Sequence, residues 1–204
     1  MKAKIFSIAR SCLTLCSTVL LLLGTPAQAR DAEAWDLNNS LSRLSFVSIK
    51  GTDIDEVHSF SQLAGKLTDD GQVQIAIELA SVETLIPIRN QRMQTLLFET
   101  EIFPTATLRA KIDPALLTAL STGGVVTQTV DAKLSVRDQT TAITLEVIAA
   151  KTSADRLVVS TLQPVLLNAG ALGLSEGVEK LRAVAGLPNI SQAVPVSVFL
   201  TFDR

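Results

Sequence analysis

Residues 81–107 read SVETLIPIRNQRMQTLLFETEIFPTAT, and this stretch interrupts an alternating apolar and polar pattern that runs on both sides of it. Four apolar side chains recur in it at helical spacing: Ile88, Met93, Leu96 and Leu97. The polar residues among them fall on the opposite side of a helix. Pro87 suits the first turn, where a missing N–H costs nothing, and Pro104 ends the segment. The pattern predicts a short amphipathic helix over residues 88–97 that covers an opening in a sheet protein.

The segments around this helix alternate as half-buried β-strands do. We expect strands over residues 35–37, 43–49, 59–67, 72–79, 106–110, 126–137, 143–147, 157–162 and 194–202. Asp69-Asp70-Gly71 is a turn signal between the third and fourth of these strands. Short strands at regular spacing with few helices between them predict an all-β antiparallel sheet or barrel, and closure would remove its exposed edges.

Two later stretches break the strand rhythm. Residues 114–120 suit a helical turn, and residues 175–185 suit a helix with Ser175 as its N-cap and Gly186 at its end. The letters around Ser175 also match the G-x-S-x-G pattern of a hydrolase nucleophile. That mechanism needs a histidine downstream of the serine, whereas the only histidine, His58, lies upstream. We therefore interpret Ser175 as a helix cap.

The first 29 residues have the pattern of a secretory signal peptide. Lys2, Lys4 and Arg10 form a positive region, an apolar run of about a dozen residues follows, and residues 27–29 read A-Q-A as a cleavage site does. The run is shorter than the roughly 20 residues that a transmembrane helix needs, so we expect no integral membrane span. The pattern predicts export to the periplasm, cleavage after Ala29, and one domain over residues 30–204.

Cleavage would leave an exported protein without thiols, because both cysteines, Cys12 and Cys16, precede the cleavage site. Stability must then come from a core, and about 175 residues suffice for one. The loss of three cations changes the net charge from −2 to −5. A mildly acidic surface does not suit nucleic acid or anionic lipid headgroups, which call for basic patches.

Residues 81–107 also resemble a family signature that reads S-(V/I)-x-T, x-R-D-x-H-L, F-F, (Y/F)-P and A-T-F. The matching residues are Ser81, Val82, Thr84, Arg89, Met93, Phe98, Phe103, Pro104, Ala106 and Thr107. On these residues the chain is identified as a member of the YceI-like family of periplasmic lipid-binding proteins. Asn90 stands where that family usually has Asp, and Arg92 where it usually has His. The resemblance implies an antiparallel lipocalin-like β-barrel of about eight strands, with one or two short helices covering an end.

Residues that could carry catalysis or hold a metal are few. A zinc site needs three or four ligands, and His58 is a single histidine without an H-x-x-x-H partner. We interpret it as a histidine at the start of a strand. No Gly-rich phosphate loop precedes a helix, so nothing supports nucleotide chemistry. We predict no catalytic residue, no metal site and no cofactor, and rank an enzyme lowest among the function classes.

An eight-stranded barrel is wide enough either to be filled by side chains or to hold one small ligand. The inward candidates here are mostly medium or small, with few aromatics and no tyrosine, so an apolar lumen for a slender chain is feasible. Each buried methylene contributes about 0.8 kcal/mol, which offsets the cost of immobilising a long tail. The family resemblance implies an isoprenoid ligand with a quinone-like or prenyl-phenol head.

We expect ligand contacts at nine residues: Phe46, Phe60, Arg89, Arg92, Met93, Leu96, Leu97, Phe98 and Phe103. The two arginines either meet the head group or form salt bridges to carboxylates, the candidates being Glu83, Glu99 and Glu101. The favoured function is a non-enzymatic periplasmic carrier of an apolar isoprenoid or other long-chain lipid. The alternative is a binding module with a filled barrel that acts through its surface in envelope stress or electron transport. The sequence leaves a homodimer open.

Overall fold

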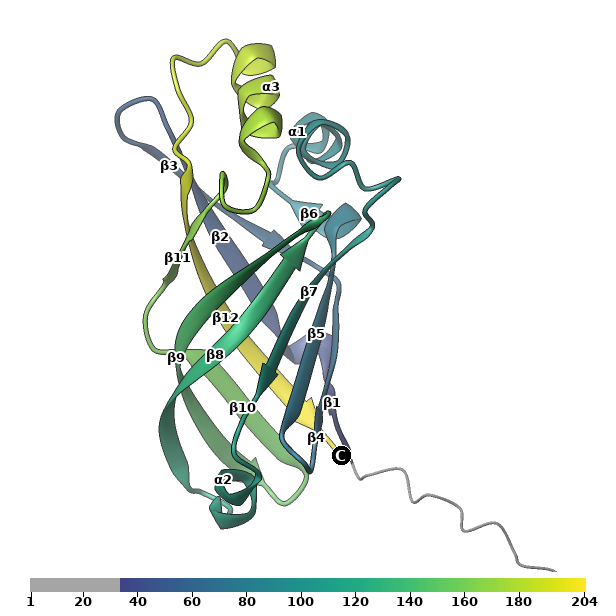
Figure 1. Cartoon of the computed structure of the whole chain (residues 1–204), viewed down its shortest axis with the longest axis vertical. Helices are drawn as coiled ribbons and strands as arrows, with labels where there is room; N and C mark the ends of the chain where they lie inside the picture. The colour runs from purple at the N-terminus through teal and green to yellow at the C-terminus, as the bar shows by residue number, and fades with distance from the viewer. Residues whose placement is uncertain (1–33) are drawn as a thin grey trace, which may run out of the picture. The chain divides into compact units, whose positions relative to one another are not determined.

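The computed structural model describes residues 34–204, and the expected signal peptide, residues 1–29, lies outside the described residues. Strands are the predominant elements of the described part (Figure 1). They are β1 (Ala34–Leu37), β2 (Arg43–Lys50), β3 (Ile54–Phe60), β4 (Leu63–Thr68), β5 (Gln72–Glu78), β6 (Val82–Glu83), β7 (Thr105–Lys111), β8 (Val125–Val136), β9 (Gln139–Ser153), β10 (Arg156–Thr161), β11 (Val165–Asn168) and β12 (Ala193–Asp203).

Within residues 34–204, eight strands close a ring in the order β1-β4-β5-β7-β8-β9-β10-β12, because β12 pairs back with β1. All these pairings are antiparallel. Strand β12 is long enough to pair with β1 near its end and with β2 nearer its start, and β3 and β6 follow β2. The predicted all-β antiparallel barrel of about eight strands is confirmed.

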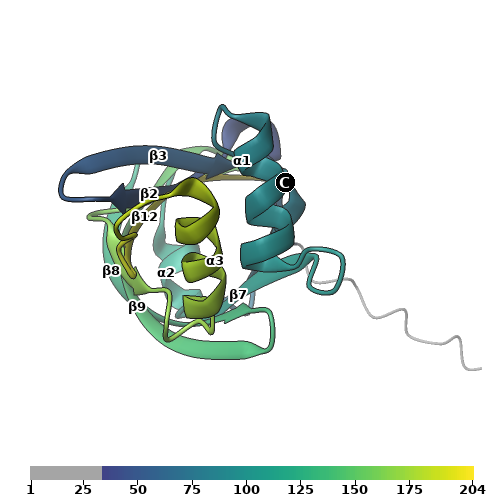
Figure 2. The ribbon, with the colours of Figure 1, turned by 90° about the horizontal axis from the view of Figure 1, so that it is seen from above.

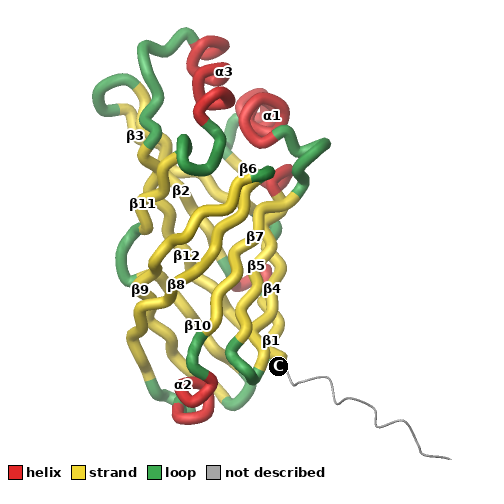
Figure 3. Tube along the Cα trace, viewed as in Figure 1, coloured by secondary structure: helices red, strands yellow, loops and turns green. Residues whose placement is uncertain are grey.

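Helices lie at the two ends of the barrel (Figure 3). They are α1 (Pro87–Arg92), α2 (Pro114–Ala119) and α3 (Ser175–Ala185), with a π-helix η3 (Met93–Phe98) directly after α1 and 3₁₀ turns η1 (Asn39–Leu41) and η2 (Leu79–Ser81). Helices α1 and α3 lie side by side over one end, seen from above in Figure 2, and α2 lies at the other end. A helix does cover an opening, as residues 81–107 predicted.

The tight hairpin between β4 and β5 is confirmed at the predicted turn. Gly71 adopts φ +83°, a conformation that other residues rarely take, and a Cβ there would collide with the backbone oxygen of Ile112. The turn therefore requires glycine. Pro87 also occupies the first turn of α1, and Pro104 stands directly before β7, both as predicted.

Three local predictions are wrong. The strand expected over residues 59–67 is the end of β3 and most of β4, separated at Ser61. Strand β3 begins at Ile54, so His58 lies inside a strand and not at its start. Helix α3 is capped at Leu174 without a side-chain bond, and Ser175 is its first residue, with its Oγ donating to Gln192 Oε1 at 3.3 Å. The C-terminal end is as predicted, because Gly186 takes the left-handed conformation.

The interior divides into two halves. Toward α2 the barrel is filled by buried side chains, among them Trp35, Leu67, Ala110, Leu157 and Phe202. Toward α1 and α3 the interior is hollow. The sequence left open whether the lumen is filled or empty, and both descriptions hold, each for one half.

Candidate functional site

A cavity of about 460 Å³ occupies the half of the barrel beneath α1 and α3. This volume falls within the roughly 300–1,000 Å³ of small-molecule pockets in proteins. Its wall combines inward-facing residues of the strands with the undersides of α1, η3 and α3. Most of these residues are aliphatic, including Leu44, Leu79, Leu134, Leu172 and Val178. The arrangement suits an apolar ligand.

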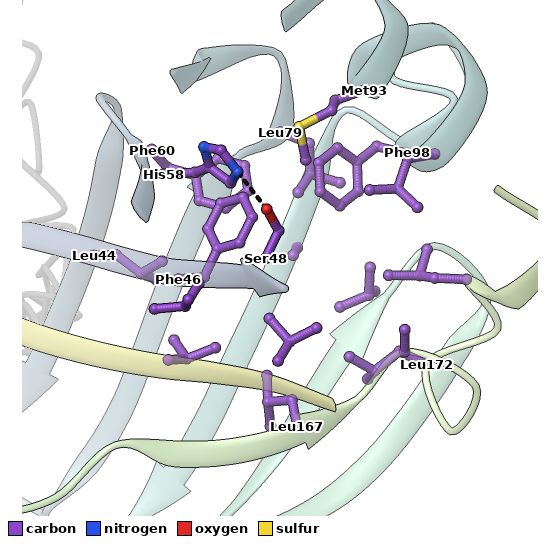
Figure 4. Close-up of a pocket in the computed structure, with 18 of the residues that line it drawn as sticks. Leu44, Phe46, Ser48, His58, Phe60, Leu79, Met93, Phe98, Leu167 and Leu172 are labelled. Atoms are coloured by element: carbon purple, nitrogen blue, oxygen red, sulfur yellow. Dashed lines mark hydrogen bonds between the residues drawn. The ribbon is translucent and has the colours of Figure 1, made fainter. Parts of the chain in front are cut away.

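A row of rings forms one side of the cavity (Figure 4). The centroids of Phe46 and Phe60 lie 5.4 Å apart, and those of Phe60 and Phe98 lie 5.8 Å apart. Tilted aromatic pairs at such separations are favourable contacts. Phe98 belongs to η3, so the row connects β2 and β3 to the helix that covers the barrel.

His58 continues this row, with its ring 5.2 Å from that of Phe46. It is 3% exposed, and its Nε2 lies 2.8 Å from the hydroxyl of Ser48, whereas its Nδ1 has no partner among the described residues. Burial lowers the pKa of His58, and the nearby charges of Arg89 and Lys50 add to this, against an opposing effect of Glu56. The imidazole is therefore neutral near pH 7 and acts as a hydrogen-bonding group.

The charged side chains gather at the same end of the cavity. Glu56 on β3 accepts from both Lys50 and Arg89, which ties α1 to the strands below it. Burial raises the pKa of Glu56, but the bonds from these two cations outweigh burial and lower it overall. Arg92 also lines the cavity, and it makes no hydrogen bond or ion pair with any residue in the described part of the chain. One cation without a partner in residues 34–204 thus borders a mainly apolar space.

Seven of the nine residues expected at the site line the cavity: Phe46, Phe60, Arg89, Arg92, Met93, Leu97 and Phe98. Leu96 and Phe103 do not. The wider turn of the π-helix directs Met93 and Leu97 inward and leaves Leu96 at the side, where its backbone faces Gly177 of α3. Phe103 lies under the guanidinium of Arg137, with the charge 5.2 Å from the ring centre.

The expected ion-pair partners of the arginines are also wrong. Arg89 pairs with Glu56, while Glu99 pairs with Arg137 and Glu83 accepts from the amide of Asn90. Glu56 is distant from Arg89 in the sequence, and it lies beneath α1 because β3 runs to this end of the barrel. Sequence reasoning missed Ser48 and His58 as members of the site. The signal that could have found them is the alternation of Glu56, His58 and Phe60, which puts all three on one face of a strand.

A model of the YceI-like domain matches residues 35–202 of the chain. This chain belongs to the YceI-like family. The resemblance recognised in residues 81–107 is thereby confirmed. A comparison with curated proteins gives no match.

Solved structures agree with this assignment. A polyisoprenoid binding domain from Saccharophagus degradans, implicated in plant cell wall breakdown, is 35% identical, with a TM-score of 0.81 over 83% of this chain and 97% of that one. BcnA of Burkholderia cenocepacia is 17% identical, with a TM-score of 0.63 over 81% and 98%. A YCEI protein of Campylobacter jejuni is 14% identical, with a TM-score of 0.54 over 76% and 90%. The last two share the fold of this YceI-like chain.

Residues 34–204 contain neither a candidate metal site nor a helix that could span a membrane. No group of three or more His, Cys, Asp or Glu side chains in this range could hold a metal ion. Among the helices of the same range, none has the length and apolar character needed to cross a membrane.

Proposed function

We propose that this YceI-like protein is a non-enzymatic carrier that holds an apolar isoprenoid-type lipid in the barrel lumen and works in the periplasm. The observation that carries the proposal is the aliphatic and aromatic cavity of about 460 Å³ beneath α1 and α3. Burial of apolar surface contributes about 25 cal/mol per Å², so a tail enclosed there binds without directed bonds. An isoprenoid is favoured because a 35% identical relative is described as a polyisoprenoid binding domain.

The polar groups of the cavity support a head at the end near α1. Ser48, His58 and Arg92 line the cavity there, and Arg92 has no partner of its own in residues 34–204. A head that carries a carbonyl, phenolate or phosphate oxygen would accept hydrogen bonds from the guanidinium. The alternative of a surface-acting module with a filled barrel fits only the half of the barrel near α2.

Native mass spectrometry of protein purified from its own host tests the proposal. We expect a bound lipid whose fragments show an isoprenoid spacing, released on organic extraction. Leu108→Trp should exclude it, because Leu108 lines the cavity. Val73→Trp is the matched control, since Val73 belongs to the neighbouring strand β5, packs against the cluster that contains Ala110, and does not line the cavity. Lipid-free native protein that does not take up a polyprenyl lipid in vitro would contradict the proposal.

A further inference from the structure

The cavity mouth is bordered by apolar side chains that water also reaches. Ile86 is 41% exposed and Ile88 53% at the start of α1, and Val184 is 48% exposed near the end of α3, yet all three line the cavity. Leu85 stands next to them and is 86% exposed. We call these four residues the mouth rim. Figure 2 looks down on the two helices that carry it.

Leu85 is in an unfavourable position for a leucine in two ways. Its side chain is almost fully in water, and its backbone adopts φ +62°, which residues other than Gly, Asn and Asp seldom take. Folding therefore gains nothing from a leucine here, where asparagine would suit the backbone and the solvent better. Such a residue points to a function outside the folded core.

The segment that carries Leu85 is held firmly. Asn90 Oδ1 accepts from the backbone N–H of Thr84 at 2.8 Å and from its hydroxyl at 2.6 Å, and Asn90 Nδ2 donates to Glu83 at 3.2 Å. Glu83 in turn accepts from the backbone N–H of Leu85. An aspartate at position 90 would accept the first two bonds but could not donate the third. Leu85 is thus presented to solvent by an ordered turn.

The charges near the rim indicate what it contacts. The two cations closest to it along α1 and α3 are occupied, because Arg89 pairs with Glu56 and Arg182 with Glu179. Arg92 lines the cavity. With Arg89 and Arg182 paired, Arg92 is the one cation left without a partner there in residues 34–204, and a single cation attracts anionic lipid headgroups only weakly, whereas exposed apolar side chains enter the boundary of a neutral or zwitterionic bilayer.

We infer that the mouth rim docks on a zwitterionic phospholipid surface and passes the ligand directly between the bilayer and the cavity. The inference rests on the proposed lipid-carrier function. Three of the four rim residues also line the cavity, so an apolar tail that leaves a bilayer at this point does not cross water. A protein partner seated on the rim would instead cover these exposed apolar residues at the cavity mouth.

Flotation of the purified protein with phosphatidylcholine vesicles tests the inference. We expect wild-type protein to float and Leu85→Asn to float roughly tenfold less, since a large apolar side chain is lost from the interface. Leu166→Asn is the matched control, because Leu166 is 74% exposed on β11 and does not line the cavity. Leu85→Asn should unfold at the same temperature as wild type or higher, and should bind a polyprenyl lipid in solution unchanged.

A second variant reports insertion directly. Trp35 is buried, so in Leu85→Trp a blue shift of fluorescence on addition of vesicles comes from position 85. The inference would be overturned if wild-type protein fails to float, or if Leu85→Asn and Leu166→Asn lose flotation equally. Neither result would contradict the proposed binding of a lipid in solution. If wild-type protein does not float but forms a dimer that Leu85→Asn abolishes, the mouth rim contacts a second copy of the chain. This result would also overturn the inference.

Discussion

Arg92 is the residue on which ligand selectivity depends in the proposed function. Arg92 lines the cavity and has no hydrogen-bond or ion-pair partner in residues 34–204, and a charge-assisted hydrogen bond contributes about 1.5–3 kcal/mol. We predict that Arg92→Ala lowers affinity for a prenyl lipid with an acceptor head by roughly tenfold or more. Affinity for a headless hydrocarbon of equal length should not change, because tail burial is non-directional. Fluorescence competition with both ligands measures the two affinities.

Arg89 provides the control for this prediction. It pairs with Glu56 and so holds α1 on β3. Arg89→Ala should reduce thermal stability and weaken both ligands together. Equal losses for headed and headless ligands in Arg92→Ala would show that Arg92 is structural, and the head-group role would be withdrawn.

His58 makes stability depend on pH. Its folded-state pKa lies below the ordinary value of 6.5, so between those two values the unfolded chain binds a proton that the folded chain does not. We predict that the free energy of unfolding falls as pH drops below about 6.5, by at most about 1.4 kcal/mol per pH unit from this group. Urea unfolding at pH 7.5 and pH 5.5 measures the change.

His58→Gln separates this effect from the carboxylates. The glutamine stays neutral, and the pKa of Glu56 is lowered from 4.5, outside the window. The variant should be less stable at pH 7.5 because the contact with Ser48 is altered. Its loss of stability between pH 7.5 and 5.5 should be clearly smaller than that of the wild type, and an equal loss would contradict the assignment to His58.

At the scale of elements, the contact between α3 and η3 depends on a glycine. A Cβ at Gly177 would lie 2.8 Å from both the backbone oxygen of Leu96 and the Cα of Leu97. Gly177→Ala should therefore destabilise the protein by about 1–3 kcal/mol, although alanine is the better helix former by about 1 kcal/mol in an isolated helix. Because α3 would be displaced from η3, ligand exchange should also become faster.

Thermal unfolding and the rate of ligand release measure these two effects. Glu179→Ala, on the exposed side of α3, is the control and should alter both only slightly. A stabilised Gly177→Ala would mean that the two helices do not pack as closely as this contact requires.

Strand β3 shows why part of the fold could not be predicted. In most strands the apolar residues face inward, and their alternation identified them. In β3 the face that carries the buried His58 and Phe60 also carries Glu56 and the exposed Ile54, and Val57 on the other face is exposed as well. The first half of β3 therefore lacks the usual apolar and polar alternation, because the strand supplies polar groups to this end of the site, and the strand start was missed and His58 with it.

The helix over the barrel, α1 with η3, also shows a structural detail that the sequence pattern does not predict. Its existence and its place followed from the apolar spacing and from Pro87. The change from α-helix to π-helix at Met93 leaves no mark in that spacing, and it decides that Leu97 lines the cavity and Leu96 does not. The residues of the helix that covers the barrel could be predicted, but the direction in which each side chain points could not.

At the scale of the whole molecule, the barrel separates stability from binding. The half near α2 is packed with buried side chains, and the half near α1 and α3 holds the cavity. A fully packed barrel would be more stable, because each void loses contacts among its lining atoms. The filled half compensates for the hollow one, and it does so without a disulfide in residues 34–204, which contain no cysteine.

The absence of cysteine after residue 16 leads to a prediction about export. If residues 1–29 are a signal peptide, the mature protein begins at Arg30 in the periplasm and holds no thiol. Its unfolding temperature should then be the same with and without a reducing agent, and a thiol reagent should label nothing in denatured material. N-terminal sequencing and the intact mass of protein from an osmotic-shock fraction measure the start of the chain. Mature protein that begins at Met1, or that reacts with the thiol reagent through Cys12 and Cys16, would show that the segment is retained.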